Sequence, residues 1–335
     1  RAGVVGLQTA LSLLEAGYGV IVVAKYWPGD KSIDYTSPWA GAHWRPHAAV
    51  DELELQKYEM ATFRYWTEMV KKVPKEECGV TILPDTYFWD SGNPETISAL
   101  WWPNLIPNIR MIPESDLIPG TTLGMMYHSF CIDVPMYLDY LVGKLGDLGV
   151  KTITAEVDTL EDVFELPGIE DDVVVGMVNC TGMGALNLVP DEKVYPMKGQ
   201  TVIVKGRAKQ ITFRKGEGYV AYVVPRIGEE ITVLGGTQGV RDWDPEPNSA
   251  VTEEILKRCK AIAPELLNEK GEFEIIAVQA GRRPSREGGP RVALVKHAGG
   301  KFICHNYGHG GAGYQSSFGS AMEVVSLVNG FLGRK

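Results

Sequence analysis

Two motifs in the second half of the chain carry side chains that could hold a carboxylate. Arg283 lies in the run Gly281-Arg282-Arg283-Pro284, and Tyr222 lies in an alternating apolar run. A guanidinium group binds a carboxylate through two parallel hydrogen bonds, and a tyrosine hydroxyl can add another. Both residues also have a structural interpretation, because surface arginines form salt bridges and strand tyrosines usually pack in a core. The pair is therefore a candidate carboxylate site.

A glycine pair at the start of the sequence could hold a dinucleotide. Gly3-Val4-Val5-Gly6 matches the second half of the GxGxxG fingerprint, in which glycines let the backbone approach a pyrophosphate. Amide groups at a helix N-terminus also attract phosphate. Arg1 stands at the first glycine position, so we expect a strand upstream of it. The alternative is a degenerate loop that binds nothing.

Lys25 stands where this fingerprint usually places an acid, roughly 20 residues after the glycines. A lysine cannot accept hydrogen bonds from ribose hydroxyls, although it can meet a phosphate. This residue argues against NAD as the ligand. A solvated lysine at the end of a strand is the simpler interpretation.

The hydrophobic pattern predicts a mixed α/β protein. Helical spacing predicts helices over residues 4–16, 51–72, 134–149 and 252–263, and a last helix that ends near Leu332. Strands are expected at residues 19–25, 150–155 and 173–178, and the apolar runs predict that the first and last are buried. Residues 199–239 alternate as in an antiparallel sheet. Residues 80–130 suggest short strands and loops.

Composition excludes several classes of protein. The chain has 335 residues, 33 Lys and Arg against 42 Asp and Glu, and a formal charge of −9. This acidity argues against binding to nucleic acid, and no apolar run approaches the roughly 20 residues of a membrane span. Five irregularly spaced cysteines predict neither a disulfide framework nor a metal pair, so we expect reduced thiols, an intracellular location and no metal. Glycine is abundant, at 38 residues.

The chain resembles the D-amino-acid oxidase family, its fungal members in particular, in a set of short segments that follow the family order. These segments are Ser37–Trp44, Val178–Gly182, Val194–Gln200, Ala221–Arg226, Gly235–Thr237, Gly281–Arg286 and His305–Gln315. The resemblance implies an FAD-dependent oxidase. Such an enzyme transfers a hydride from the Cα atom of a D-amino acid to flavin N5, releases a 2-oxo acid and ammonia, and reduces O₂ to hydrogen peroxide.

The implied fold is a Rossmann-type FAD-binding domain joined to a substrate domain built on an antiparallel β-sheet. The FAD domain would be assembled from residues 1–50, 134–190 and 290–335. The substrate domain would comprise residues 51–133 and 191–289. The resemblance further implies a homodimer and a peroxisomal location.

The resemblance also assigns the substrate contacts. Arg283 and Tyr222 would bind the α-carboxylate, and the Gly311 carbonyl would accept from the amine. Tyr219 is the nearest candidate for a tyrosine on a mobile lid. No general base is implied, so His309 is interpreted as loop structure. These contexts argue against a sarcosine or glycine oxidase, while Arg1 and Lys25 keep open a non-catalytic dinucleotide-fold protein.

A larger set of residues would hold FAD, with backbone amides of the second glycine loop stabilising the reduced ring. Gln315 is expected on the first turn of the last helix. The cofactor set comprises Gly3, Val4, Gly6, Lys25, Thr36, Ser37, Gly41, Ala42, His43, Trp44, Val157, Gly182, Gly308, Gly310, Gly311, Ala312, Gly313, Tyr314 and Gln315.

Two residues bear on the substrate side chain in opposite senses. Arg45 could bind the second carboxylate of D-aspartate or D-glutamate, or it could be a salt-bridged loop arginine. Gln238 stands where mammalian D-aspartate oxidases tend to carry arginine, which favours neutral D-amino acids. D-aspartate oxidation is the alternative. Arg282 should face away from the substrate if its segment is extended.

Overall fold

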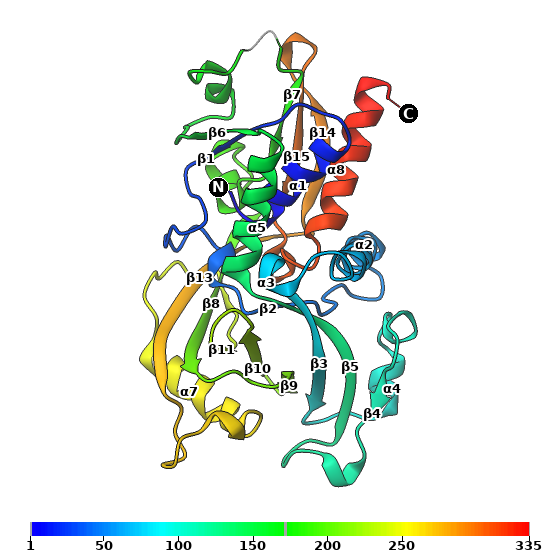
Figure 1. Cartoon of the computed structure of the whole chain (residues 1–335), viewed down its shortest axis with the longest axis vertical. Coiled ribbons are helices and arrows are strands. Elements are labelled where there is room, and N and C mark those ends of the chain that lie inside the picture. The colour runs from blue at the N-terminus through cyan, green and yellow to red at the C-terminus, as the bar shows by residue number, and fades with distance from the viewer. Residues whose placement is uncertain (1, 171–172, 335) are drawn as a thin grey trace.

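Strands that are distant in the sequence lie side by side in the computed structural model, which describes residues 2–170 and 173–334. β1 (Ile21–Ala24) pairs in parallel with β6 (Lys151–Thr154). β7 (Gly176–Asn179) pairs in parallel with β15 (Phe302–Tyr307), whose other edge pairs antiparallel with β14 (Arg291–Lys296). Figure 1 shows these strands with α1, α5 and α8 in the upper part of the molecule. Both termini of the chain lie there too.

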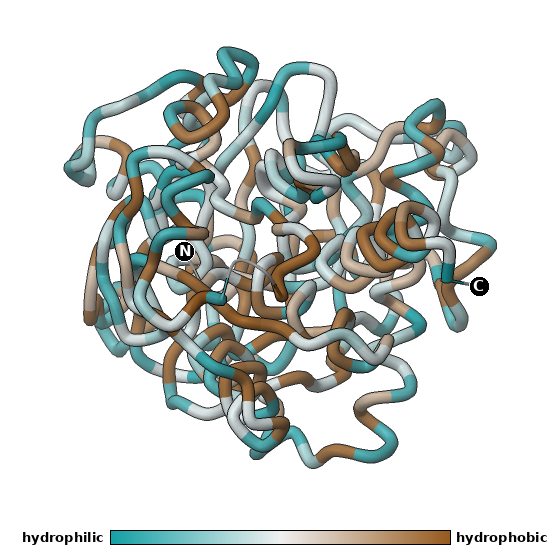
Figure 2. The backbone as a smooth tube through the Cα atoms, turned by 90° about the horizontal axis from the view of Figure 1, so that it is seen from above, coloured by the Kyte–Doolittle hydropathy of each residue, from teal (hydrophilic) through white to brown (hydrophobic). Residues whose placement is uncertain are grey.

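α1 (Val4–Glu15), α5 (Val134–Asp147) and α8 (Ser317–Leu332) bury their apolar faces around these strands. In α1 the stripe of Val4, Leu7 and Leu11 is buried, and Gly17 then takes a left-handed φ of 83° after the helix end. Figure 2 shows hydrophobic residues along the helix that ends at the C-terminus, where Val324 and Val328 are buried. The predicted helices at residues 4–16 and 134–149 are confirmed.

The lower part of Figure 1 is a large, mostly antiparallel sheet. Its order is β12 (Gly239–Val240), β8 (Val194–Lys205), β11 (Ile231–Gly235), β10 (Tyr219–Arg226), β9 (Ile211–Gly216), β3 (Val80–Trp89), β5 (Leu123–Ile132) and β2 (Ala42–His43). β13 (Ile275–Arg286) pairs along β8, and β4 (Arg110–Met111) pairs with β5. α7 (Ser249–Lys260) covers β8, β10 and β11 by burying Ile255 and Cys259. The antiparallel sheet predicted from residues 199–239 is confirmed.

The remaining helices connect the two parts. α2 (Leu53–Met69) packs against α8, and α3 (Lys75–Cys78) packs against α5. Short helices α4 (Pro94–Ser98) and α6 (Ala185–Leu188) lie in connections. No helix within residues 2–170 and 173–334 is long and apolar enough to cross a membrane.

Two predicted elements are wrong in extent. Residues 80–130 contain two ten-residue strands, β3 and β5, paired along their whole length, where short strands were expected. Pairing between the two strands stabilises their full length, and the local sequence pattern does not indicate that pairing. The strand predicted at residues 173–178 begins only at Gly176, and Val173 and Val175 are 71% and 51% exposed.

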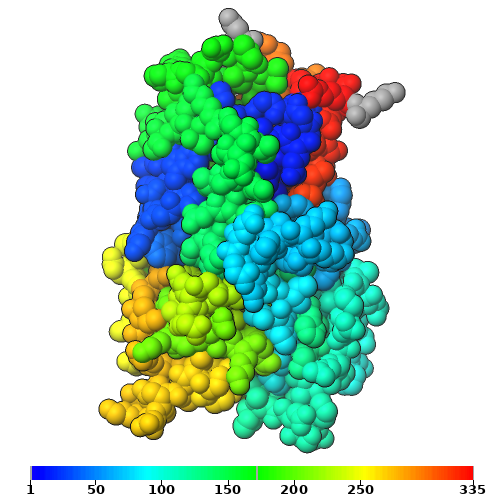
Figure 3. Space-filling view, viewed as in Figure 1, coloured from blue at the N-terminus to red at the C-terminus, as the bar shows by residue number. Residues whose placement is uncertain are grey.

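Figure 3 shows the first, middle and last segments of the chain gathered in the upper part of the molecule. One element crosses the predicted boundary, because β2, within residues 1–50, pairs with β5 of the large sheet. The division at residues 50, 133, 190 and 289 stays a prediction.

Candidate active site

An elongated space begins between the two parts of the molecule and continues into the upper part. One cavity of about 340 Å³ is lined by the N-terminus of α1, the segment 34–47, and residues of β8, β10, β13 and the 306–315 loop. A second cavity of about 720 Å³ follows α1 past β1, the segment after β6, and β7. Gly6, Cys180 and Thr181 line both, so the two cavities meet beside the N-terminus of α1. We call the first the substrate-end cavity and the second the nucleotide-end cavity.

Most of the residues singled out in the sequence line the substrate-end cavity. They are Gly3, Val4, Gly6, Thr36, Ser37, Gly41, Ala42, His43, Arg45, Gly182, Tyr222, Gln238, Arg283, Gly308, His309, Gly310, Gly311, Gly313, Tyr314 and Gln315. Lys25 and Val157 line the nucleotide-end cavity. The fold therefore brings together segments that are hundreds of residues apart.

Three predicted residues lie elsewhere. Trp44 is fully buried behind the cavity wall, and its indole Nε1 donates to the Glu59 carbonyl at 2.9 Å. Tyr219 lies within β10, not on a lid, and its hydroxyl donates to Asp90 at 2.5 Å. Ala312 lies in the glycine loop outside the cavity lining.

The first glycine loop is packed against the segment that follows β1. A Cβ atom on Gly3 would lie 2.9 Å from the Ser37 hydroxyl, which accepts a hydrogen bond from the Val4 amide at 3.0 Å. Gly3 is therefore required for close approach of this segment to the start of α1. Arg1, which stands at the first glycine position of the fingerprint, lies outside the described residues.

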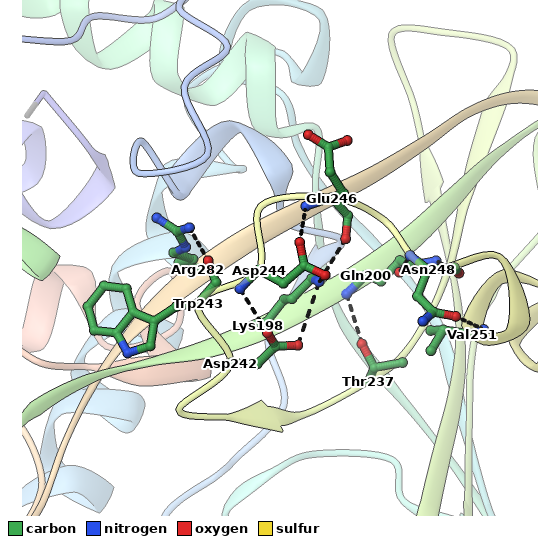
Figure 4. A network of polar contacts seen from close by, with 10 residues as sticks. All are labelled: Lys198, Gln200, Thr237, Asp242, Trp243, Asp244, Glu246, Asn248, Val251 and Arg282. Carbon is green, nitrogen blue, oxygen red and sulfur yellow. Dashed lines mark hydrogen bonds and ion pairs between the residues drawn. The ribbon is translucent and has the colours of Figure 1, made fainter.

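Arg283 reaches the cavity from β13, opposite β8. Its Nη1 donates to the Thr237 carbonyl at 2.9 Å. A Cβ atom on Gly199 would overlap the guanidinium group, so Gly199 provides the space that Arg283 occupies. Thr237 is anchored in turn, because its hydroxyl accepts from the Gln200 amide at 2.8 Å (Figure 4). The rest of this guanidinium faces the cavity.

Glycines make room for Tyr222 in the same way. Its ring lies over Gly235 and Gly236, where a Cβ atom on either residue would overlap it. Phe213 is its cross-strand neighbour in β9. Burial raises the pKa of the Tyr222 hydroxyl, although the nearby Arg283 opposes the shift. The hydroxyl stays protonated and can donate to a carboxylate.

The arginines around β13 divide into two kinds. Arg282 pairs with Asp34 at 3.1 Å and does not line the cavity, as the alternation predicts. Its guanidinium group also donates to the Trp243 carbonyl (Figure 4). Arg286 pairs with Asp191 at 2.8 Å. Across residues 2–170 and 173–334, neither Arg283 nor Arg45 forms an ion pair with a carboxylate.

The interpretation of Arg45 as a salt-bridged loop arginine is therefore wrong. Its guanidinium carbon lies 4.2 Å from the centre of the Phe213 ring and 5.8 Å from that of Tyr87. Its Nη2 lies 3.0 Å from Nε2 of His47. Aromatic faces hold the cation without forming an ion pair with it, so the guanidinium at the cavity wall stays charged.

The second glycine loop depends on backbone conformations that suit glycine. Gly308 and Gly310 have φ values of 88° and 55°. The Tyr314 hydroxyl donates to the Ser37 carbonyl at 3.0 Å, which connects this loop to the cavity-lining segment 34–47. Gln315 precedes α8 instead of lying on its first turn, and its side chain donates to Glu59 at 2.6 Å. His309 lies 2.9 Å from the Asn306 side chain, and burial lowers its pKa to about 4.

Comparison with known proteins identifies the family. The family model described as FAD dependent oxidoreductase matches residues 2–327. The D-amino-acid oxidase of Schizosaccharomyces pombe is 34% identical over 335 residues, which cover 98% of this chain and 94% of the relative. The D-amino-acid oxidase of Fusarium vanettenii is 32% identical over 350 residues, covering 98% and 95%. The chain belongs to the FAD-dependent oxidoreductase family.

Solved structures agree on the fold of this oxidoreductase. The glycine oxidase from Bacillus cereus superposes with a TM-score of 0.75 at 18% identity and covers 98% of this chain and 93% of its own. The predicted mixed α/β architecture, with an FAD-binding part and a sheet-based part, is confirmed. The cofactor of the family is FAD.

The chain's own features fit FAD. An extended dinucleotide requires an extended slot, and the two cavities meet beside the glycine loop at the start of α1. Buried ring or hydroxyl atoms of His43, Ser285 and His309 have no hydrogen-bond partner among the described residues. A polar ring system in the cavity would supply such partners. Backbone positions at Gly41 and Gly308–Gly313 line the same space.

Two buried acids lie near the substrate end. Burial raises the pKa of Glu59 to about 7 against hydrogen bonds from the His47 and Ala48 amides and Gln315. Burial also raises the pKa of Asp85 to about 7, and neither of its oxygens has a hydrogen-bond partner among the described residues. Within the part of the chain that the structure describes, no group of His, Cys, Asp and Glu could hold a metal ion.

Several residues of the site were not predicted from the sequence. His47 and Phe213 line the substrate-end cavity, and Glu59 and Asp85 lie behind it. Phe213 could have been found only from the strand register, which pairs it with Tyr222. A signal for His47 was its position two residues after Arg45 in the flavin-side segment.

Proposed function

We propose that this oxidoreductase oxidises D-amino acids to 2-oxo acids, with release of ammonia and hydrogen peroxide. The observation that carries the proposal is Arg283, a guanidinium group at the cavity wall with no carboxylate partner among the described residues. The full-length similarity to curated D-amino-acid oxidases supports it. The small-molecule partners are then a D-amino acid and O₂.

Each polar group of the substrate has a counterpart in the cavity. Arg283 would bind the α-carboxylate through its guanidinium fork, and the Tyr222 hydroxyl would donate a further hydrogen bond. The Gly311 carbonyl would accept from the amine. A methyl group on Gly311 would lie 3.5 Å from His47 and 3.8 Å from Arg283, so these groups surround one small volume.

FAD supplies the redox chemistry when bound, by taking up two electrons that O₂ then removes. The chain itself fixes the orientation of Cα by holding the carboxylate and the amine. The loop 308–313 lines the cavity, and its backbone amides would face bound FAD and favour negative charge there. No side chain acts as a base in this account, and His309, with its lowered pKa, is interpreted as a loop-stabilising group.

The decisive test is turnover by the flavin-loaded protein. Peroxide release is expected from D-alanine or D-aspartate and not from their L-enantiomers. Turnover of both enantiomers, or of none of these four amino acids, would overturn the proposal. Purified protein without flavin absorbance would contradict the cofactor assignment as well.

D-aspartate oxidation remains the second candidate, and one observation favours it. Arg45 lines the same cavity and lacks the carboxylate partner that a structural arginine would have. Gln238, which favoured neutral substrates in the sequence, lines this cavity too.

We also propose a homodimer in peroxisomes. Resemblance to the D-amino-acid oxidases supports both properties, and peroxide as the product supports the compartment. Sedimentation of the flavin-loaded protein tests the assembly, and a monomer at micromolar concentration would exclude it. Fluorescence microscopy of the natural full-length protein tests the compartment.

A further inference from the structure

The substrate-end cavity carries two guanidinium groups for which residues 2–170 and 173–334 supply no ion-paired carboxylate. We propose that Arg45 is the binding residue for a second carboxylate, so that the site prefers D-amino acids with an acidic side chain. This proposal rests on the proposed function and specifies its substrate class. It reverses the preference for neutral substrates that Gln238 suggests in the sequence.

Contacts on the expected amine position connect the two arginines. Gly311 lies beside both His47 and Arg283, since a Cβ atom there would be 3.5 Å from His47 and 3.8 Å from Arg283. His47 in turn lies 3.0 Å from Arg45. A substrate whose amine binds at Gly311 and whose α-carboxylate binds Arg283 can therefore direct its side chain toward Arg45.

The surroundings of Arg45 hold its charge in place without cancelling it. The guanidinium rests on the shelf formed by Phe213 and Tyr87, and its buried Nε has no hydrogen-bond partner among the described residues. Aromatic faces orient such a cation while leaving its edge free for a planar, bidentate partner. A carboxylate satisfies that edge better than an amide or a methyl group does.

The titratable groups around Arg45 do not already fill this role. His43 and His47 line the cavity, and burial together with Arg45 lowers the pKa of each, so both are neutral. Glu59 is committed to two backbone amides and Gln315. Asp85 is wholly buried outside the cavity lining, on the strand that carries Tyr87. Burial raises the pKa of Asp85 and Arg45 acts electrostatically to lower it, and this attraction weakens the pull of Arg45 on a second anion.

The test compares substrates that differ only in charge. We would measure kcat/KM of the flavin-loaded protein for D-aspartate against D-asparagine, and for D-glutamate against D-glutamine. The expected acid-to-amide ratio exceeds one and falls about ten- to a hundredfold in Arg45→Gln, since charge pairs of this kind are worth that much. Arg45→Lys should keep part of the ratio, because it retains the charge without the fork.

The matched control is Arg282→Gln, which alters a neighbouring arginine that is paired with Asp34 outside the cavity. Its acid-to-amide ratio should equal that of the wild type. A wild-type ratio below one, or an equal ratio in wild type and Arg45→Gln, would overturn this inference while oxidation of D-asparagine still upheld the proposed function. Absence of oxidation for every D-amino acid would instead sink the proposed function itself.

Discussion

The two ends of the elongated space differ in whether their basic side chains form ion pairs. At the nucleotide end, Lys25 pairs with Glu156 at 2.5 Å, and both residues line that cavity. At the substrate end, Arg283 and Arg45 have no carboxylate partner among the described residues. The positive charge of the protein is therefore neutralised by an acid of the chain at the end where the adenosine of FAD would lie. The fold leaves positive charge where a substrate would contribute a carboxylate.

The same contrast exists within one strand. Arg282 and Arg286 of β13 each have an acid within 3.1 Å, whereas Arg283 between them faces Gly199 and the cavity. An arginine is therefore not informative by its type alone. Its partner, or the lack of one, separates a structural arginine from a ligand-binding one.

Removal of Arg283 should produce the largest effect. Arg283→Ala loses the bidentate anchor, and we expect kcat/KM for D-amino acids to fall about 10³-fold, equivalent to about 4 kcal/mol. Steady-state peroxide release measures it. Arg282→Ala should change this parameter far less, and equal losses in the two variants would erase the distinction between paired and unpaired arginines.

A methyl group on Gly199 should sharpen the comparison without removing any charge. Gly199→Ala would displace the Arg283 guanidinium, whose flexible end can move, so stability should change little. We expect KM to rise about tenfold, the equivalent of one weakened hydrogen bond to a charged group. Kinetics and a thermal melt on the same sample separate the two effects. A large fall in Tm with an unchanged KM would show that Gly199 serves packing alone.

Asp85 offers a pH-dependent test of the charge at the substrate end. Burial raises its folded-state pKa from 3.8 to about 7, so between these values the folded protein binds a proton that the unfolded chain does not. Its contribution to stability therefore falls as pH rises from about 4 to 7. As pH rises from 5 to 8, Asp85→Asn should gain about 3 kcal/mol of unfolding free energy relative to the wild type, since each pH unit below the folded-state pKa is worth about 1.4 kcal/mol. Denaturant unfolding at the two pH values measures this, and a pH-independent difference would refute the assignment.

The smallest effect is expected at the nucleotide end. Lys25 and Glu156 are an exposed pair, and such pairs contribute little. Glu156→Gln should change the FAD dissociation constant of the apoprotein by at most a few-fold, as followed by quenching of flavin fluorescence. A loss of FAD binding in this variant would mean that Glu156 contacts the cofactor directly.

Much of the fold could be predicted from the sequence because its elements carry local signals. The stripe of α1, the helix at residues 134–149 and both glycine loops follow from spacing and residue type. The long pairing of β3 with β5 could not be predicted, because the local sequence of one strand does not identify the strand that pairs with it.

The site divides along the same line. Arg283 and Tyr222 lie in recognisable motifs. The residues that pack against them in the fold do not. Phe213 faces Tyr222 only through the register of β9 with β10, and Gly199 makes room for Arg283 only through the pairing of β8 with β13. Glu59 lies in α2, where it accepts hydrogen bonds from the His47 backbone amide and the Gln315 side chain. The sequence of this helix carries no signal that distinguishes Glu59 from its other acidic residues.

The most direct test of the account asks whether the substrate end binds a carboxylate. Titration of the flavin-loaded protein with propionate, and with its neutral isostere propionamide, would be followed by the flavin absorbance spectrum. We predict that propionate shifts the spectrum, that propionamide binds at least tenfold more weakly, and that Arg283→Ala loses the preference while Arg282→Ala keeps it. Equal binding of both ligands by the wild type, or an unchanged preference in Arg283→Ala, would contradict the account.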